Sequence, residues 1–268
     1  MSSPTWWSWY LENNILSKEV VDFLSDIKFC DLGSNSLLLV DLVKEMKSKR
    51  FLDLGVRNGA SSAALSVNAS ENNNQVYGCD LNFAGLTLYG EKFVSENYVR
   101  CQADSVTLGK NWNSDPLDII FVDTLHTREI VLAELYFWSK HINESGYFVF
   151  HDSHWDHTTK GDMIAGKEYR RVDEAITEFF NLPKNVMELT EYEDDDIFLT
   201  HHQGNYGMTF VKIKTLNAIE RFKDEIDWEE VFNLRNELSD LHFNKNNPKF
   251  IDWKQDIPNI QNELIITP

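Results

Sequence analysis

The sequence predicts an α/β fold built on a doubly wound, mostly parallel sheet. Between residues 50 and 150, short apolar runs alternate with stretches whose apolar residues recur at helical spacing, which is typical of successive βα units. The runs are apolar along their whole length, and this continuity indicates strands that are buried on both faces, as in parallel sheets. With 268 residues, the chain is long enough for one main domain with appendages.

Seven strands are expected in the sheet, and the last two form a hairpin. The turn-prone residues 202–205 separate these two strands, so the hairpin places an antiparallel strand at the sheet edge. The predicted strands are Arg50–Leu54, Gln75–Cys79, Tyr98–Gln102, Leu117–Val122, Gly146–Phe150, Ile197–Thr200 and Gly207–Lys214. The predicted helices are Ala60–Val67, Gly85–Glu96, Arg128–His141 and Tyr169–Phe180.

Two appendages flank the predicted sheet domain, which spans residues 46–215. Residues 1–45 combine an aromatic cluster at positions 6–10 with an amphipathic stretch, so an N-terminal helical cap is expected. Aromatic clusters are more often core or subunit contacts than ligand platforms, and a homo-oligomer is therefore one arrangement to consider. Residues 216–268 are first helix-like and charged, and then contain Pro and Asn, which indicates a helical and extended C-terminal appendage.

Charge and composition narrow the choice of partners. The chain carries 43 acidic and 25 basic residues, for a formal net charge of -18, and this charge repels phosphate backbones, so we expect no nucleic acid partner. Its three cysteines are scattered, which favours a reducing cytoplasm over a disulfide framework. The N-terminus lacks the pattern of a secretory leader, and no apolar run is long enough to span a bilayer. We therefore expect a cytoplasmic protein without membrane contact.

The segment after the first predicted strand, residues 53–61, combines a strand end, a glycine turn and a helix start. Gly55 is expected where the chain turns sharply and where a missing Cβ lets a ligand approach the backbone. Gly59 is expected to let the new helix lie close to the strands. The N–H groups at such a helix start suit a carboxylate or phosphate, although a plain tight turn uses the same residues.

Acidic residues follow the next two strands. Asp80 ends the second strand, where a carboxylate can accept hydrogen bonds from two ribose hydroxyls; the other interpretation is a loop carboxylate or a helix N-cap. Asp104 and Ser105 follow the third strand, where the aspartate can accept from an adenine amino group and Ser105 can present its backbone N–H to the ring. Asp104 can equally cap the helix that follows.

Taken together, the pattern Asp53-x-Gly55-x-x-x-Gly59-x-Ser61 with Asp80 and Asp104-Ser105 resembles the successive motifs with which class I methyltransferases bind S-adenosylmethionine (SAM). The resemblance covers roughly residues 45–215 and implies a Rossmann-like fold. Its Gly-x-x-x-Gly spacing favours SAM over NAD, because nicotinamide enzymes use Gly-x-Gly-x-x-Gly.

The resemblance also implies how SAM is bound. The residues around Gly55 would receive the methionine part, Asp80 would bind the ribose and Asp104 would meet the adenine. Many members carry glutamate at the position of Asp53, and the aspartate preserves the charge that faces the SAM ammonium. The implied SAM-binding residues are Asp53, Gly55, Arg57, Asn58, Gly59, Ser61, Asp80, Leu81, Asp104, Ser105 and Asp123.

The fourth and fifth strand ends carry candidate catalytic residues. Asp123 follows a buried strand, and the fifth strand opens into His151, Asp152 and, two residues later, His154. Neighbouring parallel strands end side by side, so Asp123 and Asp152 are expected to converge on one divalent cation, with His151 or His154 as a further ligand. The preferred ligand set is Asp123, His151 and Asp152. An oxygen-rich site suits Mg or Mn, while added imidazole admits Fe, Ni or Zn.

Two versions of the chemistry are open at this centre. A metal would bind neighbouring substrate oxygens and lower the pKa of an alcohol. Without a metal, His126 or His154 would remove the alcohol proton while SAM supplies the methyl group. The candidate catalytic residues are therefore Asp123, His126, Asp152 and His154, and a structural or solvated role is the other interpretation for each histidine.

The segment from Asp123 to Asp152 resembles macrocin-type sugar O-methyltransferases and cephalosporin-hydroxylase-like proteins. This resemblance implies a small-molecule or sugar acceptor, methylated on a hydroxyl of a sugar, a glycan precursor or a glycosylated small molecule. Macrocin-type members generally have paired acids after the fifth strand, whereas this chain has His151-Asp152. The aromatic residues at positions 6–10 and the segment Trp155–Lys167 are expected to close over the acceptor.

Two other functions are consistent with the same residues. A metal-dependent, hydroxylase-like oxygenase of the same fold would use the region of Asp123, His151 and Asp152, and oxygen consumption would identify it. A non-catalytic SAM-binding subunit would bind SAM tightly without turnover and would recruit a basic partner through its acidic surface.

Overall fold

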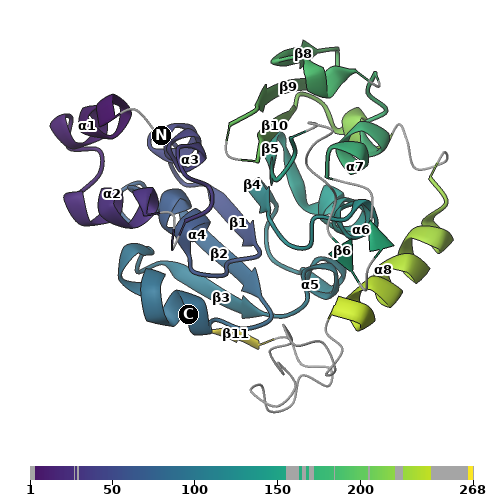
Figure 1. The fold of residues 1–268 in the computed structure, drawn as a ribbon, viewed down its shortest axis with the longest axis horizontal. Helices are drawn as coiled ribbons and strands as arrows, with labels where there is room; N and C mark the ends of the chain where they lie inside the picture. Colours follow the sequence, from purple (N-terminus) through teal and green to yellow (C-terminus); the bar gives the residue numbers. More distant parts are fainter. Residues whose placement is uncertain are drawn as a thin grey trace.

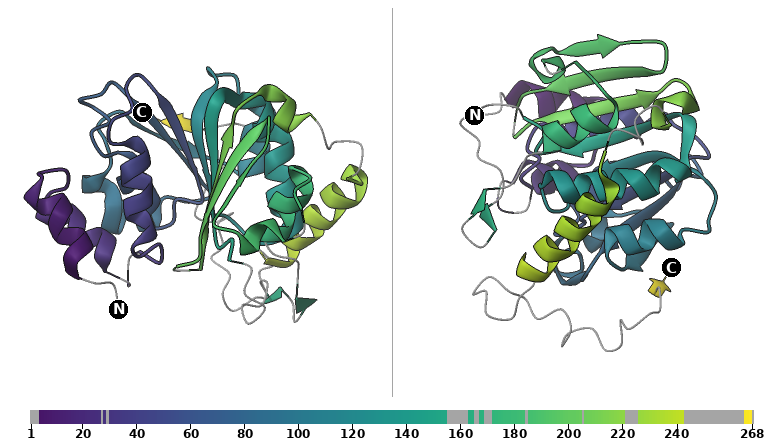
Figure 2. Two further views of the ribbon diagram at one scale, coloured as in Figure 1. Left: turned by 90° about the horizontal axis from the view of Figure 1, so that it is seen from above. Right: turned by 90° about the vertical axis from the view of Figure 1, so that its right-hand side faces the viewer.

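A computed structural model describes residues 4–26, 28, 30–154, 163–164, 167–168, 172–183, 185–204, 206–220, 226–242 and 265–267. One nine-stranded sheet runs through this part of the chain, with helices on both of its faces (Figure 1). The turned views show the sheet between the N-terminal helices on one side and helix α8 (Trp228–His242) on the other (Figure 2). Among the described residues, no helix is long and apolar enough to cross a membrane.

Five parallel strands form the centre of the sheet, in the order β3-β2-β1-β4-β5. Antiparallel strands extend it on both sides, with β10, β9 and β8 after β5, and β11 beside β3. The strands of the sheet are β1 (Arg50–Leu54), β2 (Gln75–Asp80), β3 (Tyr98–Gln102), β4 (Leu117–Val122), β5 (Ile142–His151), β8 (Glu191–Glu193), β9 (Ile197–His202), β10 (Met208–Ile213) and β11 (Ile265–Thr267). A separate small hairpin pairs β6 (Met163–Ile164) with β7 (Lys167–Glu168).

The predicted α/β class with a doubly wound, mostly parallel sheet is confirmed. All seven predicted strands are present, and the last two, β9 and β10, form the expected antiparallel hairpin. Strands β8 and β11 are additional. Each has three residues, which is too short to produce a recognisable alternation of polar and apolar side chains.

The central strands are buried on both faces, as their continuous apolar sequences predict. In β4, Ile120 and Val122 belong to the core shared with helices α5, α6 and α7, while Ile119 and Phe121 belong to the core shared with helices α1 to α4. The helices are α1 (Pro4–Glu12), α2 (Lys18–Ser25), α3 (Asn35–Val43), α4 (Ala60–Leu65), α5 (Ser105–Asn111), α6 (Arg128–Trp138) and α7 (Val172–Phe179).

The predicted helix Gly85–Glu96 is shorter and less regular than expected. It consists of a π-helical turn, η1 (Leu86–Gly90), followed by a 3-10 turn, η2 (Glu91–Phe93). A Cβ on Gly90 would lie 2.4 Å from the carbonyl oxygen of Asn58. This segment therefore packs tightly against the glycine turn that follows β1. The two short turns take the place of the predicted amphipathic helix.

The described residues before position 45 include the helices α1, α2 and α3, which share a core with α4. A side-chain hydrogen bond also joins these helices to the turn between β9 and β10, where Asn35 Nδ2 donates to the Gly204 carbonyl at 2.7 Å. The domain boundaries at residues 45 and 215 stay predictions.

Gly55 lies where the chain leaving β1 crosses the chain leaving β4. Its φ is +93°, and an added Cβ would lie 2.0 Å from the carbonyl oxygen of Asp123. Backbone hydrogen bonds hold the crossing in place, because Asp123 N–H donates to the Leu54 carbonyl and Gly55 N–H donates to the Cys79 carbonyl, both at 2.9 Å. The alignment of these strand ends therefore requires a residue without a Cβ at position 55.

We predict that Gly55→Ala lowers the free energy of unfolding by about 2 kcal/mol or more, because a side chain at this φ is strained and the Asp123 backbone would have to move. Gly204→Ala is the matched control, since the nearest atom to its added Cβ is 4.0 Å away, and its effect is expected to stay within about 0.5 kcal/mol. Denaturant unfolding followed by circular dichroism measures both changes. Equal stability of the two variants would contradict the prediction.

Candidate active site

The residues predicted to bind SAM follow the carboxyl ends of adjacent strands. In the sheet register, Leu54 lies beside both Cys79 of β2 and Val122 of β4, and Asp80 lies beside Gln102 of β3. Val122 in turn lies beside Phe150 of β5. The structure therefore brings five consecutive strand ends together at one edge of the sheet, as ligand sites of doubly wound folds require.

The glycine turn is packed more tightly by protein than the sequence suggests. The missing Cβ of Gly55 makes room for the Asp123 backbone, whereas the sequence predicts that it leaves room for a ligand. Gly59 has a φ of +86°, and its added Cβ would lie 2.3 Å from Leu86 Cδ1. The segment that packs closely against Gly59 is therefore η1. The sequence predicts close packing of helix α4 against the strands at this glycine, and the structure shows close packing of η1 there. Arg57, between the two glycines, has a left-handed φ of 49°.

Asp53 lies fully buried beneath this turn. Its Oδ2 accepts hydrogen bonds from the hydroxyls of Ser61, at 2.8 Å, and Ser62. Burial raises the pKa of Asp53 to about 7, although the two hydroxyls oppose the shift. Its other oxygen, Oδ1, has no hydrogen-bonding partner among the described residues. Ser61, predicted to bind SAM, here connects α4 to the end of β1.

Asp80 lies beside the glycine turn, as the sequence predicts. Its Oδ2 accepts from the Arg57 backbone N–H at 2.8 Å, and its Oδ1 accepts from the Asn82 N–H at 3.1 Å. Burial raises the pKa of this carboxyl above its usual value, while the backbone donors, including Leu81 N–H, lower it. The carboxylate therefore joins the turn after β1 to the loop after β2. The Asn58 side chain also approaches this loop, because a Cβ on Gly85 would lie 2.8 Å from Asn58 Oδ1.

Asp104 caps helix α5, which was the other interpretation of this residue. Its Oδ1 accepts from the Thr107 backbone N–H at 2.9 Å and from the Thr107 hydroxyl at 3.0 Å. Its Oδ2 forms an ion pair with Arg235 of α8. Sequence reasoning missed Arg235, and no local pattern could have found it, because it lies 131 residues further along the chain.

Glu134 of α6 is a second acidic residue that sequence reasoning did not place in the site. Its side chain is fully buried, and its Oε1 accepts from the Ser105 hydroxyl and, at 2.8 Å, from the Thr124 hydroxyl. Burial raises the pKa of Glu134 to about 7, with a smaller contribution from Asp104, while the hydroxyls and Arg235 oppose the shift. Glu134 Oε2 has no hydrogen-bonding partner among the described residues.

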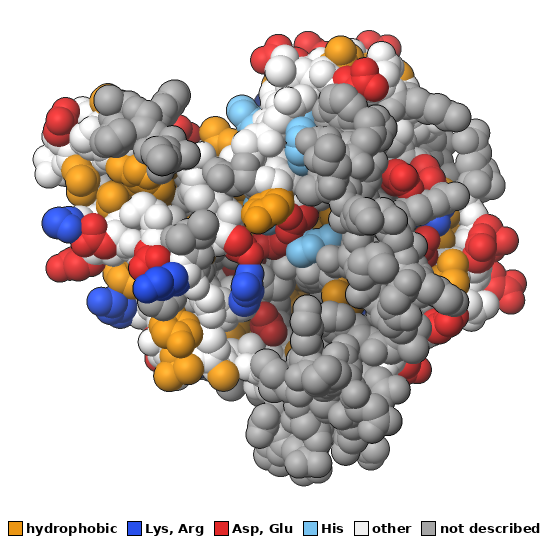
Figure 3. All heavy atoms as spheres, viewed as in Figure 1, with side chains coloured by type: hydrophobic (Ala, Val, Ile, Leu, Met, Phe, Trp, Pro, Cys, Tyr) orange, Lys and Arg blue, Asp and Glu red, His pale blue; other side chains and the backbone are white. Residues whose placement is uncertain are grey.

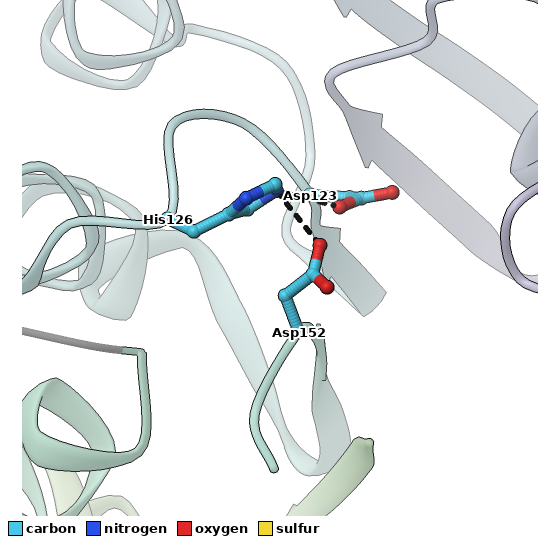
Figure 4. A group of neighbouring side chains, drawn as sticks. All are labelled: Asp123, His126 and Asp152. Carbon is cyan, nitrogen blue, oxygen red and sulfur yellow. Dashed lines mark hydrogen bonds and ion pairs between the residues drawn. The ribbon is translucent and has the colours of Figure 1, made fainter. Parts of the chain in front are cut away.

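Three of the four candidate catalytic residues, Asp123, His126 and Asp152, form one cluster after β4 and β5 (Figure 4). His126 Nε2 lies 3.3 Å from Asp123 Oδ1 and 2.9 Å from Asp152 Oδ2. His151 Nδ1 lies 3.3 Å and 3.2 Å from the same two oxygens. The two imidazoles therefore alternate with the two carboxylates. Asp152 reaches this position from a left-handed backbone with a φ of 52°.

The electrostatics of this cluster favour ionised carboxylates. Burial lowers the pKa of His151, but Asp123 and Asp152 outweigh this effect and raise it to about 10. Burial would raise the pKa of both carboxyls, but His126 and His151 outweigh it and hold both below the usual range. The buried His151 therefore acts as a cation that compensates the charge of the two aspartates.

Asp123, His126 and Asp152 each offer a ligand atom within 4.8 Å of the others, so these three residues could hold a metal ion. The sequence predicts His151 as the third ligand, whereas the structure places His126 in that position and His151 in a fully buried one.

His154, the fourth candidate catalytic residue, packs beside His201. Its ring lies parallel to that of His201, with the centroids 6.3 Å apart. The segment Trp155–Lys167, predicted to cover the acceptor, lies outside the described residues except for parts of β6 and β7, as does the side chain of Trp6.

Residues 52–153 match a family described as a methyltransferase domain. The matched segment begins in β1 and ends just after β5. The matched segment thus includes all five strand ends of the candidate site, from the glycine turn to Asp152. The match supports the predicted class I SAM-dependent methyltransferase family, while the macrocin-type branch stays a prediction.

Solved structures share the fold of the chain. The O-methyltransferase TomG from Streptomyces achromogenes, solved in complex with SAM, is 15% identical with a TM-score of 0.52, and the alignment covers 80% of this chain and 100% of TomG. Cofactor-bound Rv0187 from MTB is 11% identical with a TM-score of 0.52, covering 80% of this chain and 99% of its own. No curated protein matches the chain. At these identities the likeness shows the fold, which is that of Rossmann-like methyltransferases.

We predict that Glu134→Gln changes how stability depends on pH. The pKa of Glu134 is raised in the folded state from 4.5 to about 7, so its stabilising contribution is fully present below pH 4.5 and is lost as the pH rises through 7. Relative to the native chain, the glutamine variant should therefore gain up to about 3 kcal/mol between pH 4.5 and pH 8. Denaturant titrations across this range measure the difference, and Glu191→Gln on the exposed edge strand is the control. Parallel curves for the native chain and Glu134→Gln would contradict the prediction.

Proposed function

We propose that this chain is a SAM-dependent O-methyltransferase that acts on a hydroxyl of a sugar, a glycan precursor or a glycosylated small molecule. The observation that carries the proposal is the place of Asp80 within a segment that matches a methyltransferase domain. Its carboxylate lies against the glycine turn, and the Asp123–His126–Asp152 cluster follows strands β4 and β5 of the same sheet edge.

The residues around the glycine turn fit the chemistry of SAM. The Asp80 side chain is partly exposed, and its carboxylate already interacts with the backbone N–H groups of the turn after β1 and the loop after β2. Ribose hydroxyls would share this carboxylate with those backbone donors. The unpartnered Oδ1 of Asp53 would be satisfied by the ammonium of SAM or by an ordered water. Buried acceptors without partners are costly, which favours a ligand or water there.

SAM, when bound, would supply an electrophilic methyl group on its sulfonium. The chain itself has to orient the acceptor hydroxyl and remove its proton as the new carbon–oxygen bond forms and the carbon–sulfur bond breaks. Among the described histidines, His126 is best placed for this step. Its Nε2 lies 2.9 Å from Asp152 Oδ2, and its side chain is 34% exposed, so it can meet a substrate while Asp152 holds the ring.

A divalent cation, Mg or Mn, is part of the proposal. Ligands at adjacent positions around an octahedral ion with bonds of about 2.1 Å lie about 3 Å apart. The distances of 2.9 Å and 3.3 Å from His126 Nε2 to the two carboxylates are compatible with this spacing, although hydrogen bonds between the same atoms give it as well. A cation held by Asp123, His126 and Asp152 would lower the pKa of the acceptor hydroxyl. Without a cation, His126 itself would take the proton, and metal removal separates the two versions.

Tyr206, in the turn between β9 and β10, supports a sugar or glycoside acceptor. Its side chain is 58% exposed, and its ring stands nearly perpendicular to that of His151, with the centroids 6.5 Å apart. An exposed aromatic ring beside a catalytic cluster offers an apolar face on which a sugar ring can stack. In the space-filling view, acidic and histidine side chains gather at the centre of one face of the molecule (Figure 3). No local sequence pattern points to Tyr206, because its position depends on the hairpin turn.

We predict that Asp80→Asn weakens the binding of S-adenosylhomocysteine about 10-fold to 100-fold, because a charged acceptor of the ribose hydroxyls is lost. Isothermal titration calorimetry measures the affinity. Asp115→Asn is the matched control, since Asp115 is an exposed acid that pairs with Arg50 at the amino end of β1. Native affinity in Asp80→Asn would contradict the placement of the ribose, and a native chain that does not bind the ligand would contradict the proposed function.

We also predict that Asp152→Asn lowers methyl transfer by about 100-fold or more, while the affinity for S-adenosylhomocysteine stays within about twofold. Transfer from methyl-labelled SAM to a panel of sugars and glycosides measures the activity. Dialysis against a chelator should abolish turnover, and Mg or Mn should restore it. Full turnover after chelation would contradict the metal and leave His126 as the base. Oxygen consumption in place of methyl transfer would support the oxygenase alternative.

A further inference from the structure

We propose that helix α8 forms part of the cofactor site, and that Arg235 fixes the carboxylate of Asp104 so that it recognises the 6-amino group of adenine. This inference rests on the proposed function and names residues of the same site. It assigns to the C-terminal appendage a role in cofactor selectivity, which its sequence does not suggest.

Two contacts hold the Arg235 side chain next to Asp104, at the carboxyl end of β3. Its Nη2 pairs with Asp104 Oδ2, and its Nη1 donates to Asn236 Oδ1 at 3.1 Å. The side chain is only 15% exposed, and its Nε is buried without a hydrogen-bonding partner among the described residues. An ion pair at this depth is screened less than a surface pair. One guanidinium donor therefore remains unused directly beside the residue that the family resemblance assigns to adenine.

A second unpartnered atom lies in the same neighbourhood. Glu134 interacts electrostatically with both Asp104 and Arg235, and its buried Oε2 has no partner among the described residues. Native proteins leave few buried polar atoms unpaired, and each costs about 1–3 kcal/mol. Two such atoms, from helices α6 and α8, belong to side chains that interact with Asp104, and the Asp104 side chain itself is 32% exposed, so a polar ligand group can reach its carboxylate.

Helix α8 is packed well enough to position Arg235. The rings of Trp228 and Phe232 lie 4.6 Å and 5.2 Å from that of Tyr136 on α6, and Val231 and Leu238 are buried. Arg235 lies one turn beyond the aromatic contacts. Its guanidinium therefore starts from a fixed backbone, which limits the entropy lost when it orders Asp104.

The chemistry of this pair matches one edge of adenine. Adenine offers the two donors of its 6-amino group next to a ring nitrogen that accepts. Asp104 supplies an acceptor, because Thr107 and Arg235 leave part of its capacity unused. Arg235 supplies a donor. In hypoxanthine, a 6-oxo group replaces the amino group, so an acceptor would face the carboxylate of Asp104, and this arrangement is repulsive.

The test compares two ligands, S-adenosylhomocysteine and S-inosylhomocysteine, which differ at position 6 of the base. Calorimetry with the full-length native chain should show about a 10-fold or greater preference for the adenine ligand. Arg235→Met should reduce this preference toward onefold, because Asp104 loses the partner that holds it in place. Arg235→Lys, which keeps the charge, should restore part of the preference. Glu237→Gln, an exposed change on the same helix, should leave both affinities unchanged.

The outcomes separate this inference from the proposed function. If Arg235→Met weakens both ligands equally, Arg235 only tethers α8 and the inference is overturned. Equal binding of the two ligands by the native chain overturns it as well, while leaving SAM binding intact. A native chain that binds neither ligand overturns the proposed function together with the inference. Thermal melts identify a misfolded Arg235→Met, and in that case Arg235→Lys and Arg235→Gln decide the question through the same ratio.

Discussion

The crossing of Gly55 and Asp123 is the constraint on which the rest of the site depends. A Cβ at position 55 would lie 2.0 Å from the Asp123 carbonyl oxygen, so the turn after β1 and the loop after β4 can meet only through a glycine. The crossing keeps Leu54 level with Cys79 and Val122. Once the central strand ends are level, the acidic residues that follow them lie at one edge, and the proposed cofactor and acceptor sites become neighbours.

That arrangement concentrates negative charge at one edge of the sheet. Neighbouring cationic groups compensate this charge more fully at the Asp123–Asp152 cluster than at Asp53. At the acceptor side, two imidazoles face Asp123 and Asp152, and both carboxyls have pKa values below their usual range. At the cofactor side, compensation is weaker, and burial raises the pKa of Asp53 to about 7. The cofactor side therefore favours a cationic ligand, since a positive charge would stabilise the ionised form of a buried carboxyl. The sulfonium and ammonium of SAM have this character.

Much of the fold could be predicted because its signals are local. Continuous apolar runs such as Leu117–Val122 identify buried parallel strands, and the residues that follow each run identify the strand ends. The candidate site was predictable only to that level. The place of His126 between two carboxylates depends on the loop after β4 and on the left-handed backbone of Asp152. The Arg235–Asp104 pair joins positions 131 residues apart, and periodicity carries no information about such a contact.

The most direct test of this account is a crystal structure of the chain with S-adenosylhomocysteine. We expect the ligand in the crevice at the carboxyl edge of the sheet, with the ribose at Asp80, the adenine beside the Asp104–Arg235 pair, and the sulfur toward Asp123. A ligand bound elsewhere, or a crevice that remains closed by protein at saturating ligand, would contradict the claim that these strand ends form one SAM site.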